Sequence, residues 1–304
     1  MSLLTVGTVA FDTIETPYGK AEMVVGGAAL YASIAASHFT DKINLVSVVG
    51  DDFPQTELDY MEARGITLEG LQIKEGEKSF FWAGKYHDNM NQRDTLVTDL
   101  NVLADFDPVL PESYKTSKYV MLGNLTPEVQ MKVVKQMKKR PKLIVMDTMN
   151  FWMDIAMDSL KAVIKEIDVL TINDEEARQL SGEYSLVKAA KIIQEMGPSH
   201  LVIKKGEHGA LLFHKDKMFF APAMPLAEVF DPTGAGDTFA GGFIGYLAMT
   251  DSISFENMKR AVVYGSAMAS FCVEDFSIGR MKGLKKADIN KRLKDFVRLA
   301  KFEL

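Results

Sequence analysis

Short apolar runs alternate with helical segments along most of this 304-residue chain, and this alternation constrains the fold more than any other feature. Runs such as 43–49 (INLVSVV) and 142–147 (KLIVMD) are too continuously apolar for a sheet that has one face in water. Several of them are followed by a segment with helical spacing, as at 55–64, which ends at Gly65. We therefore predict one α/β domain over residues 1–304, with a mostly parallel central sheet that helices cover on both faces.

Two segments interrupt the alternation, residues 12–25 and residues 70–98. Both read as extended, half-polar hairpins, and neither is followed by a crossover helix. The second contains residues 79–87 (SFFWAGKYH), which are rich in strand-forming types. We predict that both segments form a small antiparallel β-sheet lid on the α/β body, with aromatic side chains that a substrate or a second subunit would cover. The alternative is a long loop packed on the body.

The charge balance and the absence of targeting signals limit the partners. The chain has 35 Lys and Arg residues and 41 Asp and Glu residues, for a net charge of −6, which argues against a broad nucleic-acid surface. The first 13 residues lack the basic and apolar segments of a signal peptide, and no run approaches the roughly 18 apolar residues of a membrane helix. We expect a cytoplasmic protein with no nucleic-acid or membrane partner.

The stretch 229–243 (VFDPTGAGDTFAGGF) carries the strongest chemical signal. Gly234-Ala235-Gly236 can turn sharply and bring backbone close to a ligand, and an apolar run at helical spacing follows at once. The first N–H groups of a helix have no partner within the helix, and the helix dipole adds positive potential there. We therefore predict that this turn binds an anion through backbone amides.

Asp237 lies in the first turn of the same helix. A carboxylate at this position can simply cap the helix, but beside a bound phosphate it can also accept the proton of an attacking alcohol. The chain contains no G-x-x-x-x-G-K-[ST] phosphate loop, and no G-x-G-x-x-G follows the first strand. We therefore predict a phosphotransferase with Asp237 as catalytic base, built on neither of those motifs.

The segment 231–237 (DPTGAGD) resembles the C-terminal signature of the ribokinase-like, or PfkB, carbohydrate kinase family. Other landmarks follow in the family's order over roughly residues 3 to 300. The resemblance implies a three-layer α/β/α ribokinase-like fold with a β-sheet lid, and ATP lying across the carboxyl ends of the strands. Gly234, Ala235, Gly236 and the Asp237 amide would form the anion hole, and Asp237 would deprotonate the acceptor hydroxyl.

The same resemblance points to the acceptor site. Asp12, just after the first strand, matches the family's sugar-binding Asp, and Gly26-Gly27 matches its N-terminal glycine pair. Asn124 and Arg93 are polar residues in segments that we expect to face the substrate. For each of these two, a structural role at the surface is an equal alternative.

The nucleotide site follows from two further landmarks. Residues 173–176 (NDEE) resemble the family's N-x-x-E motif, which implies that Asn173 contacts the nucleotide phosphates or their metal and that Glu176 acts on Mg²⁺ through water. Asn173 could also cap the helix that follows it. Lys204, Gly206 and Gly209 lie in a segment that resembles the nucleotide-contacting strand and turn; for Lys204 the alternative is a charged strand end.

Cation dependence and the identity of the acceptor stay open at this point. Many family members bind a monovalent cation beside the anion hole, so Asp231 and Thr233 are candidate ligands for K⁺. The glycine pair is followed by Ala28-Ala29-Leu30-Tyr31, where polar residues such as Lys and Asn are common in the family. This departure leaves room for an apolar or aromatic portion of the substrate.

Several functions compete for this sequence. We expect ATP-dependent phosphorylation of a sugar, and the alternative on the same scaffold is a nucleoside kinase of adenosine or inosine type. A binding protein without turnover predicts loss of the base, whereas Asp237 and its turn are intact. No catalytic triad or redox fingerprint supports a hydrolase or an oxidoreductase. Pairing of the lid between subunits would make the protein a homodimer.

Overall fold

The computed structural model describes residues 2–301 and 303 and contains two β-sheets. In spatial order the large sheet has the strands β13 (Lys217–Ala221), β12 (Ala210–His214), β11 (His200–Lys204), β10 (Val169–Asn173), β9 (Leu143–Asp147), β8 (Tyr119–Leu122), β1 (Leu3–Val6), β4 (Ile43–Gly50) and β5 (Ile66–Lys74). Pairing is parallel from β11 to β5, and antiparallel only at β12 and β13. The predicted mostly parallel sheet is therefore confirmed.

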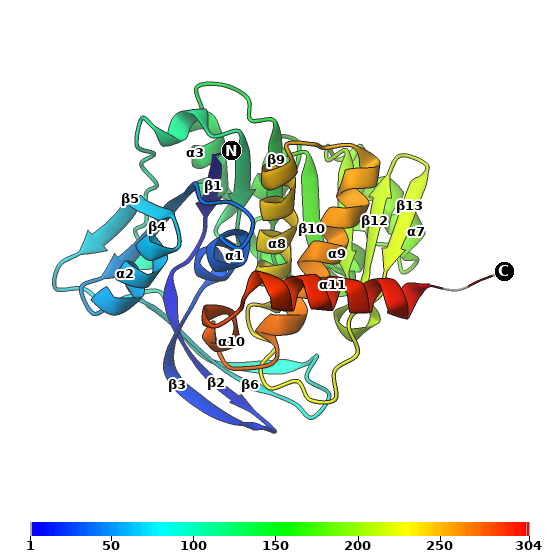
Figure 1. The fold of residues 1–304 in the computed structure, drawn as a ribbon. Coiled ribbons are helices and arrows are strands. Elements are labelled where there is room, and N and C mark those ends of the chain that lie inside the picture. The colour runs from blue at the N-terminus through cyan, green and yellow to red at the C-terminus, as the bar shows by residue number, and fades with distance from the viewer. Residues whose placement is uncertain (1, 302, 304) are drawn as a thin grey trace.

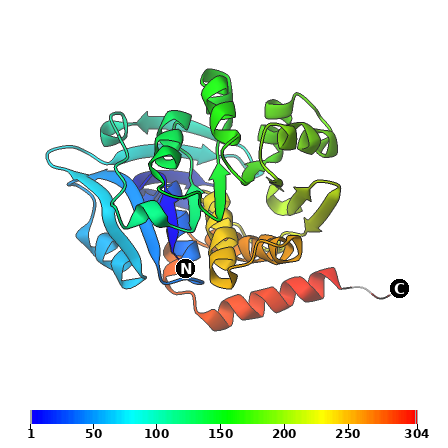
Figure 2. The ribbon, with the colours of Figure 1, turned by 90° about the horizontal axis from the view of Figure 1, so that it is seen from above.

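Helices cover both faces of this sheet (Figures 1 and 2). One layer holds α1 (Ala28–Ala36), α2 (Gln55–Ala63), α8 (Ala235–Thr250), α9 (Phe255–Cys272), α10 (Gly279–Lys282) and α11 (Lys286–Ala300). The other holds α3 (Pro127–Gln136), α4 (Asn150–Ile155), α5 (Met157–Ile164), α6 (Asp174–Ser181) and α7 (Leu186–Glu195). Short 3₁₀ turns lie at η1 (Asn101–Leu103), η2 (Tyr114–Thr116) and η3 (Gly206–His208).

The two helical layers take alternate residues of each strand. In β1, Leu3 belongs to the core beneath α1 and α8, whereas its neighbour Leu4 belongs to the core beneath α3 and α5. Successive side chains of a strand point to opposite faces, so a strand that is buried on both sides must be apolar throughout. This explains why the sequence of the central strands shows continuous apolar runs. Among the described residues, no helix is both long enough and apolar enough to cross a membrane.

A second sheet projects from the body as a lid (Figure 1). Its strands lie in the order β3 (Gly19–Gly26), β2 (Ala10–Thr16), β6 (Phe80–Tyr86) and β7 (Arg93–Asp99). The predicted lid segment 70–98 began too early, because residues 70–74 complete β5 in the large sheet. Each of the two predicted lid hairpins is antiparallel, as expected, whereas they join each other through parallel pairing of β2 with β6.

The strand order reverses direction between β1 and β8. From β1 the chain goes to β4 on one side, whereas β8 pairs with β1 on its other side. In open parallel sheets, ligands bind outside the carboxyl ends of the strands at such a switch point. The lid strands β2 and β3 follow β1 directly, so they lie at the edge where a ligand is expected.

Candidate active site

The polar residues singled out from the sequence gather at the carboxyl edge of the large sheet. Asn173 and Lys204 are the last residues of β10 and β11 and are direct partners in the strand register. Asp147 ends the neighbouring strand β9, and Asn124 comes shortly after β8. Parallel strands bring residues that are far apart in sequence to one edge, which is why this site draws on four separate strands.

The Gly234–Asp237 turn begins α8 at the same edge. Gly234 is the N-cap residue and has a left-handed backbone with a φ of 72°. A Cβ atom at this position would lie 2.4 Å from ring carbons of Tyr31, so both backbone and packing require glycine. Residues 232–237 are partly exposed, so a ligand can approach this turn. The turn therefore has the geometry of an anion site at a helix N-terminus.

Asp237 lies within a group of charges from several elements. Burial is the main cause that raises the pKa of Asp237 to about 7; the Asp147 carboxylate raises it further, while Lys204 and Arg93 lower it. A carboxyl group with a pKa near neutrality can gain and lose a proton at physiological pH. This is the property that a general base needs.

Lys204 points at the turn and pairs with Asp147. The distance from Lys204 Nζ to Asp147 Oδ2 is 2.5 Å, and both side chains are largely buried. Lys204 Nζ also lies only 3.1 Å from the position that a Cβ on Gly236 would take. The lysine is thus packed directly against the amides that begin α8, and it is at the same time the charged end of β11 that the sequence left as the alternative.

Asn173 and Glu176 form a capping box at the start of α6. Asn173 Oδ1 accepts from the Glu176 N–H at 2.8 Å, and Glu176 Oε2 accepts from the Asn173 N–H at 2.7 Å. Asn173 therefore has the capping role that the sequence left open. Burial, partly offset by Lys204, raises the pKa of Glu176 to about 7. Its second carboxylate oxygen is free of this box and could meet a metal-bound water.

A separate group of acidic residues lies where the lid meets the body. Asp12 on β2 is buried, and Gly26 on β3 lies against its carboxylate. Burial, followed by the charges of Asp231 and Asp237, raises the pKa of Asp12 to about 8. Asp231 Oδ1 accepts from the Thr233 N–H at 2.8 Å, and its Oδ2 accepts from the Ser277 N–H at 3.3 Å.

Asn124 and Arg93 have different surroundings. Asn124 Oδ1 accepts from Trp152 Nε1 at 2.8 Å, so this side chain ties β8 to α4. Arg93 is exposed on β7, with its guanidinium carbon 5.8 Å from the Trp82 ring centre, yet its charge still acts on Asp237. Arg93 therefore acts electrostatically on Asp237, whereas the Asn124 side chain connects two elements of the fold.

Gly206 and Gly209 flank η3, just after Lys204. The Asn91 side chain in the β6–β7 loop lies 3.1 Å from a Cβ placed on Gly206, so this turn adjoins the lid. The lid also reaches the anion turn, because Thr233 Oγ1 donates to Tyr86 Oη at 3.1 Å. In the described part of the chain, no group of three or more His, Cys, Asp or Glu residues is arranged to hold a metal ion directly.

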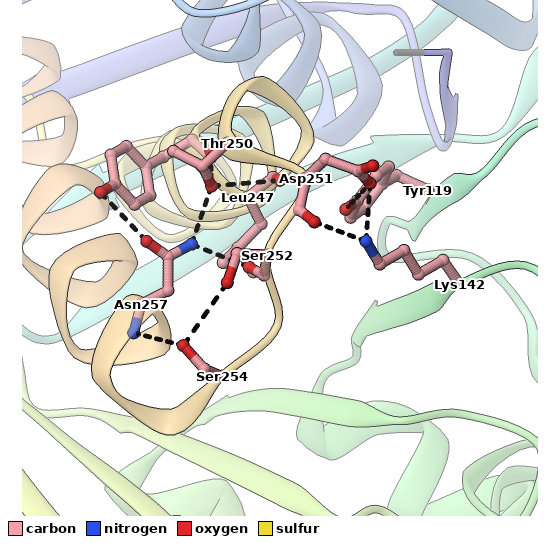
Figure 3. A network of polar contacts seen from close by, with 9 residues as sticks. Tyr119, Lys142, Leu247, Thr250, Asp251, Ser252, Ser254 and Asn257 are labelled. Carbon is pink, nitrogen blue, oxygen red and sulfur yellow. Dashed lines mark hydrogen bonds and ion pairs between the residues drawn. The ribbon is translucent and has the colours of Figure 1, made fainter.

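The far end of α8 is fixed at the opposite edge of the sheet (Figure 3). Asp251 follows the helix with a φ of 47°, and its carboxylate accepts from Tyr119 Oη at 2.9 Å and from Lys142 Nζ at 2.7 Å. Asn257 at the start of α9 donates to Thr250 Oγ1 at 2.7 Å and to the Ser252 carbonyl at 2.8 Å. The helix that carries Asp237 is thereby held at both ends.

Comparison with known proteins identifies this arrangement. Residues 2–281 match the pfkB family carbohydrate kinase family. The chain belongs to the pfkB family of carbohydrate kinases. The resemblance noted in the sequence is confirmed, and the protein is a kinase that transfers a phosphoryl group to an alcohol.

Relatives of this pfkB-family kinase act on nucleosides and sugars. A cytidine kinase from Thermococcus kodakarensis is 30% identical over 248 residues, 80% of this chain and 87% of that protein. A nucleoside kinase from Methanothermobacter thermautotrophicus is 26% identical over 293 residues, 90% of this chain and 89% of that protein. An E. coli protein assigned as a ribokinase II, solved with ATP and Mg²⁺, has a TM-score of 0.79 at 19% identity and covers 98% of this chain and 99% of its own.

Two residues of this kinase site were not found from the sequence. Asp147 ends an apolar strand, and a polar residue at that position is a signal that strand-end analysis could have used. Tyr31 was noted only as a departure after the glycine pair. Its ring packs beneath Gly234, and its buried hydroxyl has no hydrogen-bond partner among the described residues.

Proposed function

We propose that this kinase transfers the γ-phosphoryl group of ATP to a hydroxyl on the sugar of a nucleoside, with Asp237 as the base. The observation that carries the proposal is the Asp237 carboxyl group in the first turn of α8, directly after a partly exposed glycine turn with a left-handed N-cap. The amides would hold the migrating phosphoryl group, and Asp237 would take the proton from the attacking hydroxyl. Each anion-hole donor of this kind contributes about 2.7–4 kcal/mol to lowering a barrier.

The acceptor is assigned from the relatives and from the glycine-pair segment. A cytidine kinase and a nucleoside kinase each match most of this chain. Residues 28–31 after the glycine pair are buried in the core, so this segment supplies no polar side chain for the hydroxyls of a free sugar. Asp12, Gly26 and Gly27 would bind the sugar portion. A free sugar is the second candidate, because ribokinases are also among the relatives.

The remaining site residues are proposed to bind the nucleotide or the cations. Asn173, Lys204, Gly206 and Gly209 would bind ATP, as their position at the carboxyl edge supports. Glu176 would act on Mg²⁺ through water, and its free carboxylate oxygen fits that role. The metal would neutralise charge on the phosphates. Asp231 and Thr233 are proposed to lie at a K⁺ site, and the protein is proposed to be cytoplasmic.

The lid is also proposed to pair between two subunits. All seven residues of β7 are exposed, among them Leu96 at 59% and Val97 at 38%. An exposed edge strand with apolar side chains is a surface that proteins usually cover. A second copy of the lid would cover it.

Replacing Asp237 by asparagine tests the central claim. The variant should lose on the order of 10²–10⁴ in kcat while it still binds ATP, because only proton transfer is removed. Turnover is measured as ADP release, and ATP binding by calorimetry. Asp288→Asn is the matched control, since Asp288 holds the same first-turn position in α11. If Asp237→Asn kept the wild-type kcat, Asp237 would have no part in the mechanism.

A panel of nucleosides and sugars tests the acceptor. We expect formation of a nucleoside monophosphate with cytidine or another nucleoside, detected by mass spectrometry. If only free sugars were phosphorylated, the second candidate would replace the first.

A further inference from the structure

The Asp147–Lys204 ion pair lies directly beneath the anion turn, and the transfer described above gives its acidic member no role. Its two residues lie on β9 and β11, so the lysine side chain reaches across β10 to meet the carboxylate. Removing two charges from water is costly, and a buried pair of this kind is weak evidence for added stability. Its position beside Asp237 points instead to a role in the reaction.

Both members of the pair are held in place. Asp147 Oδ1 accepts from the Thr148 N–H at 2.8 Å, which leaves Oδ2 for the lysine. Gln130 Nε2 donates to the Asp147 carbonyl at 3.1 Å and to the Gly123 carbonyl at 2.9 Å, so it joins the ends of β8 and β9. With Asp147 fixed in this way, the ammonium group of Lys204 is kept against Gly236.

Several charged groups surround Asp237. Asp147 and Lys204 come from β9 and β11, Arg93 comes from β7, and Glu176 on α6 lies next to Lys204. Asp12 on β2 also faces Asp237, but it is protonated up to about pH 8, and Asp231 from the turn before α8 acts on Asp12. The two cations that act on Asp237 differ in burial, since Arg93 is exposed on the lid and Lys204 is buried. Water screens the charge of Arg93 much more than that of Lys204.

We propose that Lys204, held by Asp147, is a positioning residue that keeps the Asp237 carboxylate ionised, while Asp147 limits how strongly it does so. The inference rests on the proposed kinase reaction. In that reaction the acceptor oxygen forms a bond to the γ-phosphorus and the bond from that phosphorus to the β-phosphate oxygen breaks. The hydroxyl proton passes to Asp237, which must be ionised to take it, and ADP leaves.

The test is the pH dependence of kcat/KM for the acceptor at saturating ATP and Mg²⁺. Lys204→Met removes a cation, so the acid limb should move to higher pH by roughly one unit or more. Asp147→Asn removes an anion and leaves the lysine unpaired, so the same limb should move to lower pH. The double variant should fall between the two, and Lys204→Arg, which keeps the charge, should stay near the wild-type limb.

An ion pair at the other edge of the sheet gives a matched control. Lys142 pairs with Asp251 at 2.7 Å, far from the turn along α8 (Figure 3). Lys142→Met also removes a lysine from an ion pair at a strand end, but its pH profile should match that of the wild type. Shifts of the Lys204 and Asp147 variants in the same direction, or no shift in either, would overturn the proposal.

A second measurement separates this inference from the proposed function. The Asp237 carboxyl carbon can be followed by NMR in protein labelled with ¹³C-aspartate, and Asp237→Asn assigns its signal. Opposite displacements of this titration in the Lys204→Met and Asp147→Asn proteins are expected even if no tested acceptor is phosphorylated. If the wild-type enzyme phosphorylated no tested acceptor but the Asp237 titration moved in the two variants, only the acceptor assignment would be refuted. If the wild-type enzyme was active but the Asp237 titration stayed unchanged in both variants, only the inference about Lys204 and Asp147 would be refuted.

Discussion

Gly234→Ala should destabilise the protein by about 2–5 kcal/mol, because two separate costs meet at this residue. The left-handed backbone, with a φ of 72°, costs an alanine about 1–2 kcal/mol. The new Cβ would also lie 2.4 Å from Tyr31 ring carbons. Tyr31 is 1% exposed and cannot move aside freely, so overpacking adds about 1–3 kcal/mol.

Gly182→Ala isolates the first of these costs. Gly182 ends α6 with a φ of 74°, but nothing lies within 4 Å of a Cβ placed there. Its alanine variant should therefore lose only about 1–2 kcal/mol. Urea denaturation of both variants gives the comparison, provided that the slope of free energy against urea concentration is unchanged.

A double-mutant cycle then attributes the difference to Tyr31. In a Tyr31→Ala background the ring is absent, so Gly234→Ala should cost no more than Gly182→Ala. Equal losses for Gly234→Ala and Gly182→Ala in the wild-type background would refute the packing argument. That result would mean that the turn can shift away from α1, contrary to a rigid anion site.

Two further predictions concern the lid. In the folded protein Asp12 keeps its proton up to about pH 8, whereas in the unfolded chain it loses this proton near pH 4. Its contribution to the free energy of unfolding is therefore lost as pH rises toward and through 8. Asp12→Asn should therefore flatten the decline in melting temperature between pH 5 and pH 9, and an unchanged decline would contradict the buried position of Asp12. Leu96→Lys places a charge on the exposed β7 surface, so it should convert the dimer into a monomer, as measured by sedimentation. If the wild-type protein were itself a monomer, the proposed lid dimer would be wrong.

Much of the fold could be predicted because the central strands are buried on both faces. Their continuous apolar runs located β4 and β9 to within about one residue. β5 was assigned to the lid in part because an edge strand is half exposed, and its alternating pattern resembles that of a hairpin. The antiparallel pairing of β12 with β11 and β13 at the other edge was not predicted from the sequence.

The residues of the candidate site that lie in local motifs could be predicted from the sequence, whereas contacts between distant elements could not. Local motifs led to Asp237, Gly234 and the Asn173–Glu176 pair, because each depends on backbone geometry within a few residues. The contact between Asp147 and Lys204 depends on which strands are neighbours, and no spacing within the sequence contains that information. The same holds for Tyr31 beneath Gly234, which joins two helices that are some 200 residues apart in the chain.

Because α8 is anchored at its far end, the Gly234–Asp237 turn is held against movement along the helix axis. Movement of the four-stranded lid would open the site without displacing this turn. That sheet joins the body at places such as Gly26 and Ser79, where the Ser79 hydroxyl and N–H both donate to Asp52 Oδ1, at 2.6 Å and 2.9 Å. If lid movement limits product release, substitutions at these junctions would change kcat although they lie at a distance from the residues that do the chemistry.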